Sequence, residues 1–286
     1  MDWIRVNGHA LRYELGPANG PLLVLIHEMG GTLESWDAVC QDLGARFQTL
    51  RYDVLGSGLS EKIIGETSVD ELVDDLQALL DALCLDQPVA LCGVAVGAAI
   101  AIRFASRHPR RVSQLVALSP ACGVLAEARE ATLQRAAALR HAGLDQLIPA
   151  LMDKTWPAPL RTDPGAFERF SLRWSSADPG SFAAIFGMLA NLQLEADLPA
   201  LPARTLMVAG EYDGLRPPAE IDRLASFADH IEALHVASGH FMPVQSPRWV
   251  SYLLSGYLLE GRSGASLYQT FTTHPDNLLG DSRHAA

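Results

Sequence analysis

The chain has 286 residues, of which 49% are hydrophobic and 19% are charged, a composition that supplies a sizeable core and excludes disorder along its body. Its net charge of −11 leaves no broad positive field, so neither nucleic acid nor an anionic membrane surface is expected as a partner. The apolar runs also fall short of the roughly 20 residues that a membrane span needs.

The predicted elements begin with a β-hairpin, because Asn7-Gly8 separates two short segments of alternating apolar and polar residues. Continuous apolar runs of the kind found in strands buried on both faces follow. These runs cover residues 21–26, 47–52, 89–92, 114–118, 205–209 and 231–236. Helical segments separate most of them, which predicts an α/β fold with a mostly parallel central sheet flanked by helices.

Helical patterns complete the domain organisation. The clearest helix starts at Ser68, which forms a capping box with Glu71 ahead of one leucine-rich face. Between residues 123 and 198 the strand signals vanish, so this stretch is predicted to be a helical cap inserted into a core made of residues 1–122 and 199–260. Residues 261–286 show no sustained period and are expected to be a loosely ordered C-terminal extension.

The segment Gly93-Val94-Ala95-Val96-Gly97 lies between a predicted strand and a predicted helix. This is the setting of the nucleophile elbow, the G-x-S-x-G motif, in which flanking glycines make room for a sharp turn. Ala95 stands where the nucleophilic serine is expected. Taken alone, the two glycines also fit a helix that merely packs closely on a sheet.

An acid and a histidine follow the elbow in the order found in triads. Asp213 comes just after the run 205–209, and His240 after the run 231–236, so both lie beyond the carboxyl ends of strands, where ligand sites occur. A capping or core histidine and an Asx-turn aspartate are the structural alternatives, and Glu211 is a rival acid.

The segment His27 to Gly31 follows the first central strand and is expected to supply the second oxyanion donor. The predicted oxyanion hole consists of the backbone amides of Met29 and Val96. Glu28 either turns away from this hole, as a salt-bridged loop residue would, or serves as an acid or base in different chemistry.

These motifs resemble the α/β-hydrolase superfamily over residues 1 to about 260, with a layout close to the 3-oxoadipate enol-lactonase-like branch. Further matching segments are Trp36, 51–53, 56–60, 107–109, Trp156, 210–213 and 239–240. The resemblance implies a cofactor-free hydrolase of esters or lactones in which a serine attacks, a histidine moves protons and an aspartate orients the histidine. Carried over, it assigns roles to Asp213, His240, Met29 and Val96, but it leaves Ala95 without a nucleophilic group.

Three functions remain open. The first is a Ser-His-Asp type hydrolase of a small ester, lactone or related acyl compound whose serine is replaced by Ala95, by engineering or in nature. The second is a natural decarboxylase, lyase or isomerase with His240 as general base. The third is a catalytically dead ligand-binding protein. Cys92 and Cys122 are poor substitutes for the serine, since a buried thiol behaves as a small inert hydrophobe.

The expected partner is a small-molecule substrate held between sheet and cap, and a homo-oligomer is left open. The candidate substrate-binding residues are Glu28, Trp36, Trp156, Trp174 and Phe241. Four arginines, at 129, 135, 161 and 173, could bind a carboxylate. The first residues lack signal-peptide features and the four cysteines lack a disulfide or metal spacing, which favours a cytoplasmic protein without a metal.

Overall fold

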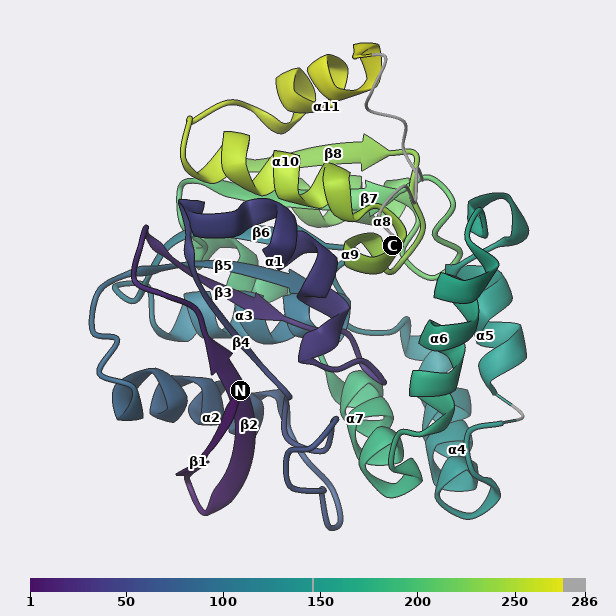
Figure 1. The fold of residues 1–286 in the computed structure, drawn as a ribbon. Coiled ribbons are helices and arrows are strands. Elements are labelled where there is room, and N and C mark those ends of the chain that lie inside the picture. The colour runs from purple at the N-terminus through teal and green to yellow at the C-terminus, as the bar shows by residue number, and fades with distance from the viewer. Residues whose placement is uncertain (146, 275–286) are drawn as a thin grey trace.

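The computed structural model describes residues 1–145 and 147–274, and eight strands in this part of the chain form one sheet (Figure 1). Their order across the sheet is β1-β2-β4-β3-β5-β6-β7-β8. The strands are β1 (Asp2–Val6), β2 (His9–Leu15), β3 (Leu22–Ile26), β4 (Gln48–Tyr52), β5 (Val89–Val94), β6 (Val112–Leu118), β7 (Thr205–Gly210) and β8 (Ile231–Val236). The predicted strands are thus confirmed, and so is the mostly parallel sheet, because the pairings from β4 to β8 are parallel while β1 and β2 pair antiparallel.

Helices cover both faces of the sheet, which explains why the central strands are apolar throughout. One face packs against α2 (Val69–Ala82), α3 (Val96–Arg107) and α8 (Pro218–Ala225). The other packs against α1 (Asp37–Leu43), α9 (Met242–Gln245), α10 (Pro247–Leu258) and α11 (Gly264–Thr273). Short 3-10 helices are η1 (Leu33–Trp36), η2 (Gly44–Arg46), η3 (Ala158–Leu160) and η4 (Glu195–Ala200). The predicted capping box is present, with the Ser68 hydroxyl and the Glu71 carboxylate each accepting from the other's backbone amide.

A group of four helices lies to one side of the sheet, between β6 and β7 in the chain (Figure 1). They are α4 (Ala126–Ala142), α5 (Ile148–Thr155), α6 (Pro164–Ser175) and α7 (Pro179–Asn191), and we call them the cap. The chain enters and leaves the cap at one place, where Gly123 and Gln193 form an antiparallel bridge and Leu194 donates its amide to Cys122. A third core, in which half of the buried side chains are aromatic, lies within the cap and reaches Phe241 of the sheet domain.

The C-terminal segment differs from the loose extension that was expected. Residues 264–273 form α11, in which Leu267 and Phe271 are buried against α10 and β8. The sequence did not predict this helix because one apolar pair at a spacing of four gives too little periodicity to detect among serines and threonines. The Ser263 hydroxyl caps the first turn of the helix. The part of the expectation that concerns residues 275–286 lies outside the described residues.

No helix among the described residues is both long enough and apolar enough to span a bilayer.

Candidate active site

The elbow has the strained geometry that its glycines predict. Ala95 has φ 54° and ψ −112°, a backbone conformation that L-residues rarely adopt, at the junction of β5 and α3. A Cβ on Gly93 would lie 2.3 Å from the Gly97 carbonyl oxygen, and one on Gly97 would lie 2.2 Å from that of Ile26. Both glycines are therefore required by close backbone contacts, and the only side chain at the point of the turn is the methyl group of Ala95.

His240 and Asp213 are paired within the interior. The imidazole Nδ1 donates to Asp213 Oδ2 over 2.7 Å, and the two side chains are 6% and 0% exposed. The other carboxylate oxygen accepts from the amides of Leu215 and Arg216, at 2.8 and 3.0 Å. Asp213 thus forms the Asx-type turn and also holds the histidine, while the rival Glu211 is exposed.

Opposing effects act on the Asp213 carboxyl. Burial by itself raises its pKa, but the charge and hydrogen bond of His240 and the two amide donors outweigh burial and leave the pKa below its ordinary value. Asp213 is consequently ionised at neutral pH. An ionised partner at Nδ1 fixes the tautomer in which Nε2 is free to accept a proton.

The cap helps to place this histidine, a connection that the sequence did not reveal. The Thr155 carbonyl oxygen, at the end of α5, accepts from the His240 amide at 3.0 Å and from Gln245 Nε2 at 2.9 Å. Gln245 Oε1 in turn accepts from the amide of Phe241. The loop that carries His240 is therefore tied directly to the cap.

The oxyanion loop, residues 27–31, is held from inside by its own histidine. His27 Nε2 accepts from the Val54 amide at 3.0 Å, so Nδ1 carries the proton and donates to the Glu28 carbonyl oxygen at 2.6 Å. The amide of Met29 makes no hydrogen bond to another described residue. Val96 is the first residue of α3, where a helix leaves its amides without partners. Both predicted oxyanion donors are therefore available.

The Glu28 carboxylate turns back onto its own loop. Its Oε1 accepts from the Ser35 hydroxyl at 2.8 Å, and the carboxyl group packs against Gly31, where a Cβ would lie only 2.2 Å from Oε1. It forms no ion pair with any described residue, contrary to the expected salt bridge, and Oε2 is buried without a hydrogen-bond partner. The side chain is 1% exposed, so it belongs to the packing of the loop.

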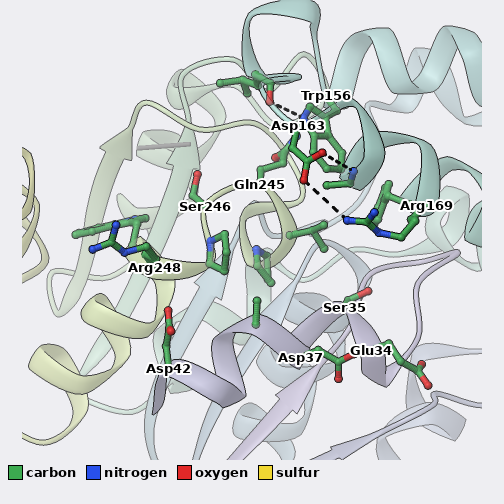
Figure 2. A pocket seen from close by; sticks show the side chains of 18 of the residues that line it. Glu34, Ser35, Asp37, Asp42, Trp156, Asp163, Arg169, Gln245, Ser246 and Arg248 are labelled. Carbon is green, nitrogen blue, oxygen red and sulfur yellow. Dashed lines mark hydrogen bonds and ion pairs between the residues drawn. The ribbon is translucent and has the colours of Figure 1, made fainter. Parts of the chain in front are cut away.

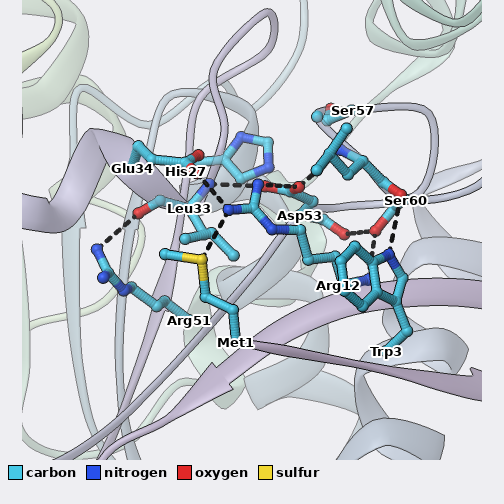
Figure 3. A network of polar contacts seen from close by, with 12 residues as sticks. Met1, Trp3, Arg12, His27, Leu33, Glu34, Arg51, Asp53, Ser57 and Ser60 are labelled. Carbon is cyan, nitrogen blue, oxygen red and sulfur yellow. Dashed lines mark hydrogen bonds and ion pairs between the residues drawn. The ribbon is translucent and has the colours of Figure 1, made fainter.

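A largely buried ionic network holds Leu33 and Glu34, which follow the oxyanion loop in the chain (Figure 3). Arg12 pairs with Asp53 at 3.1 Å and also with Glu34. Asp53, which is fully buried, accepts from the amides of Leu33 and Leu59 at 2.8 Å each. Burial alone would raise the pKa of Glu34, but the hydrogen bond from Arg12 lowers it to about 2. The sequence pointed to the Asp53 segment only as a family motif.

The predicted aromatic residues divide into two groups. Trp36 is fully buried in the core on the α1 and α10 face of the sheet. Of the five predicted substrate-binding residues only Trp156 lines one of the two pockets described below, whereas Glu28, Trp36, Trp174 and Phe241 line neither. Trp156, Trp174 and Phe241 come together in the aromatic core of the cap, with Phe241 in edge contact with the His240 ring. An aromatic residue gives the same sequence signal whether its side chain packs in a core or lines a pocket, so the sequence alone did not separate Trp36 from Trp156.

Two pockets lie between the cap and the sheet domain, and neither is lined by Ala95, Asp213 or His240. One, of about 310 Å³, lies between η1, α6 and the segment after His240, and is lined among others by Ser35, Trp156 and Gln245 (Figure 2). The other, of about 620 Å³, adjoins Gly30 and Gly31 on the side of α7. Arg173 lines both, whereas Arg129 bonds to Asn191, Arg161 pairs with Asp153 and Arg135 is exposed.

The remaining candidates for chemistry are inert or absent. Cys92 and Cys122 are buried, and burial raises the pKa of both thiols, that of Cys122 to about 12, so neither is a thiolate at neutral pH. Among the described residues there is no group of three His, Cys, Asp or Glu side chains arranged to hold a metal ion.

Comparison with known proteins fits this geometry. The model of the family described as serine aminopeptidase, S33, matches residues 18–240. The 3-oxoadipate enol-lactonase 2 of Acinetobacter baylyi is 24% identical over 249 residues, covering 86% of this chain and 92% of that protein. A hydrolase from Pseudomonas aeruginosa superposes with a TM-score of 0.83 at 26% identity, covering 90% of this chain and 98% of that one. The enol-lactonase from Burkholderia xenovorans has a TM-score of 0.84 at 22% identity and covers 90% and 99%. The chain therefore belongs to the serine aminopeptidase S33 family and has the α/β-hydrolase fold, and among proteins of that fold it resembles the enol-lactonase-like branch.

Proposed function

We propose that this chain hydrolyses a small ester or lactone by activating water with His240, without a covalent acyl-enzyme. The observation that carries the proposal is the buried pair of His240 and Asp213, which is complete although Ala95 offers no nucleophile. A protein that only binds a ligand has no use for an imidazole held in one tautomer by an ionised carboxylate.

The reaction needs three contributions from the chain. His240 Nε2 takes a proton from water as the oxygen attacks the acyl carbon, and later returns it to the leaving alkoxide. Asp213 stabilises the imidazolium that forms in between. The amides of Met29 and Val96 donate to the developing oxyanion.

The orientation of Glu28 supports hydrolysis over the non-hydrolytic alternative. Its carboxylate is bound to Ser35 and packed on Gly31, so its nearest hydrogen-bond partner is a residue of η1 and not an amide of the elbow. The substrate class is suggested by the relatives, which include an enol-lactonase and, at 26% identity, a pimeloyl-[acyl-carrier protein] methyl ester esterase from Nitrosomonas europaea.

The test compares the unchanged chain with His240→Gln, Asp213→Asn and Ala95→Ser on p-nitrophenyl butyrate. The unchanged chain should turn over without a burst and without a covalent mass increase. His240→Gln should lower the rate by about 10²- to 10⁴-fold, and Asp213→Asn should also slow it, because the tautomer is no longer fixed. Ala95→Ser should produce a burst and an acyl-enzyme detectable by mass spectrometry, since its surroundings match those of a triad serine.

Two results would contradict the proposal. Turnover by the unchanged chain that equals that of His240→Gln would exclude water activation by this histidine. A folded Ala95→Ser variant with neither acyl-enzyme nor turnover would exclude an oxyanion hole suited to esters. In that case His240 would have to act as the base of a decarboxylase, lyase or isomerase.

A further inference from the structure

The end of helix α5 contacts both loops that carry the pair of Asp213 and His240. The last two residues of the helix, Lys154 and Thr155, present consecutive carbonyl oxygens. The Lys154 oxygen accepts from the amide of Gly214, the neighbour of Asp213, at 2.9 Å, and the Thr155 oxygen accepts from the His240 amide at 3.0 Å. Carbonyl groups in the last turn of a helix have no partner within the helix. The cap therefore uses two such groups to hold the two loops side by side.

The Gln245 side chain completes this contact. Its Nε2 donates to the Thr155 carbonyl oxygen at 2.9 Å, and its Oε1 accepts from the Phe241 amide, also at 2.9 Å. One carbonyl oxygen thus receives both the His240 amide and the Gln245 side chain, while Gln245 holds the residue that follows His240. Gln245 is only 8% exposed, so both hydrogen bonds lie in the interior.

The backbone before His240 is packed closely from two sides. A Cβ on Gly239 would lie 2.6 Å from the Thr155 carbonyl oxygen and 2.7 Å from Gln245 Nε2. A Cβ on Gly210, the last residue of β7, would lie 2.5 Å from the Gly239 carbonyl oxygen. The loop therefore lies between the end of β7 and the end of α5. This explains the glycine before His240, which the sequence marked only as part of a family motif.

A second glutamine makes a similar hydrogen bond far from the catalytic loops. Gln114 Nε2 donates to the Leu258 carbonyl oxygen at 3.1 Å in partly buried surroundings. Gln114 is the third residue of β6, whereas the elbow and the Asp213 loop follow the opposite, carboxyl ends of their strands. A substitution of Gln114 removes a comparable hydrogen bond without touching the His240 loop, which makes it a matched control.

We propose that Gln245 is a positioning residue that, together with the end of α5, keeps His240 in register with Asp213. The proposal rests on the proposed function in one respect, namely that His240 is the base. Gln245 acts through the histidine and needs no contact with the substrate. Since a displacement of about 1 Å can slow a reaction by about 10²-fold, its loss should lower kcat and leave KM nearly unchanged.

The first measurement is the kinetics of full-length variants on p-nitrophenyl butyrate. Gln245→Met removes both hydrogen bonds at similar volume and should lower kcat by about 10- to 100-fold, with KM within about twofold of the unchanged chain. Gln245→Glu keeps the shape and the acceptor for the Phe241 amide, but its carboxylate repels the Thr155 carbonyl oxygen, so kcat should fall here too. It serves as the test if Gln245→Met does not fold. Gln114→Met should keep kcat within about twofold.

The second measurement is amide hydrogen exchange followed by NMR, which does not depend on hydrolysis. The His240 amide should be protected in the unchanged chain because it donates to the Thr155 carbonyl oxygen. Both Gln245 variants should lower this protection by about 10- to 100-fold, the effect of losing one or two buried hydrogen bonds. Gln114→Met should leave it unchanged.

Three results overturn the proposal. They are an unchanged kcat in a folded Gln245 variant, a lower kcat with the His240 amide protected as before, and equal losses in Gln114→Met. If no form of the chain hydrolyses the ester, the proposed function fails, and the protection of the His240 amide then decides on positioning alone. A loss of protection confined to the Gln245 variants supports the positioning role, and its absence overturns it.

Discussion

The substitution Gly31→Ala tests whether Glu28 is held against its own loop. An alanine Cβ at position 31 would lie 2.2 Å from Glu28 Oε1 and 2.4 Å from Cδ. Gly31 does not have a left-handed φ, so alanine adds no backbone strain there. The whole penalty then comes from displacing the carboxyl group of Glu28, a residue that is 1% exposed.

The size of the penalty follows from what the carboxyl group loses. Overpacking of a filled site costs about 1–3 kcal/mol, and the hydrogen bond from Ser35 adds about 0.5–1.5 kcal/mol when it is broken. Gly31→Ala should therefore lower the free energy of unfolding by about 2–4 kcal/mol. In a chain that already carries Glu28→Ala, the same substitution should cost less than about 0.5 kcal/mol, because the obstructing group is gone.

The measurement is a double-mutant cycle by urea unfolding, followed by the fluorescence of the five tryptophans. The two substitutions should couple by more than about 1 kcal/mol, with the double variant more stable than the separate effects would give. Additive effects, within about 0.5 kcal/mol, would show that the carboxylate lies elsewhere and would reopen a role for Glu28 in the oxyanion hole.

Three further predictions concern stability. Arg12→Met leaves Asp53 buried without its ion-pair partner and should lower the free energy of unfolding in urea by about 3–5 kcal/mol. The control Arg223→Met, which breaks exposed ion pairs, should lower it by less than about 1 kcal/mol, and equal decreases would contradict the buried network. Burial raises the pKa of Asp75, so the stability that its protonated carboxyl contributes is complete below the ordinary carboxyl range and is lost as pH rises through the raised pKa. Asp75→Asn should therefore be more stable than the unchanged chain at pH 7 but not at pH 3, and parallel profiles of stability against pH would contradict the raised pKa. Ser68→Ala removes the capping hydroxyl of α2 and should shift the free energy of unfolding by about 1 kcal/mol, a loss that Ser68→Asp, which keeps a capping oxygen, should largely avoid.

The strands could be predicted because each central one is buried on both faces and therefore reads as an unbroken apolar run. The elbow, Asp213 and His240 could be predicted because sharp turns and strand ends restrict the residue types that fit there. Helix α11 could not, since its stability comes from contacts of Leu267 and Phe271 with distant elements.

Side-chain direction was the main information that the sequence lacked. Whether Glu28 faces the oxyanion hole or Ser35 depends on rotamers and on the space left by Gly31, not on the pattern of residue types. The same holds for Trp36 and Trp174, two tryptophans in similar apolar surroundings, of which one fills the core and the other covers the oxyanion loop. The hydrogen bond from the His240 amide to the Thr155 carbonyl oxygen joins residues 85 positions apart, and no local sequence pattern predicts it.

The single point of entry to the cap has a consequence for engineering. Since Gly123 and Gln193 are bridged, the two ends of the cap lie side by side. Replacing the whole cap with that of a related protein therefore needs only two splice points, which lie at one location. Such a chimera would lose the hydrogen bonds that the Thr155 carbonyl oxygen accepts from the His240 amide and from Gln245, and also those from the Gly214 amide to Lys154 and from the Ile63 amide to Ser181. A replacement cap that presents a carbonyl oxygen at the place of Thr155 would change the substrate selectivity while His240 keeps its position.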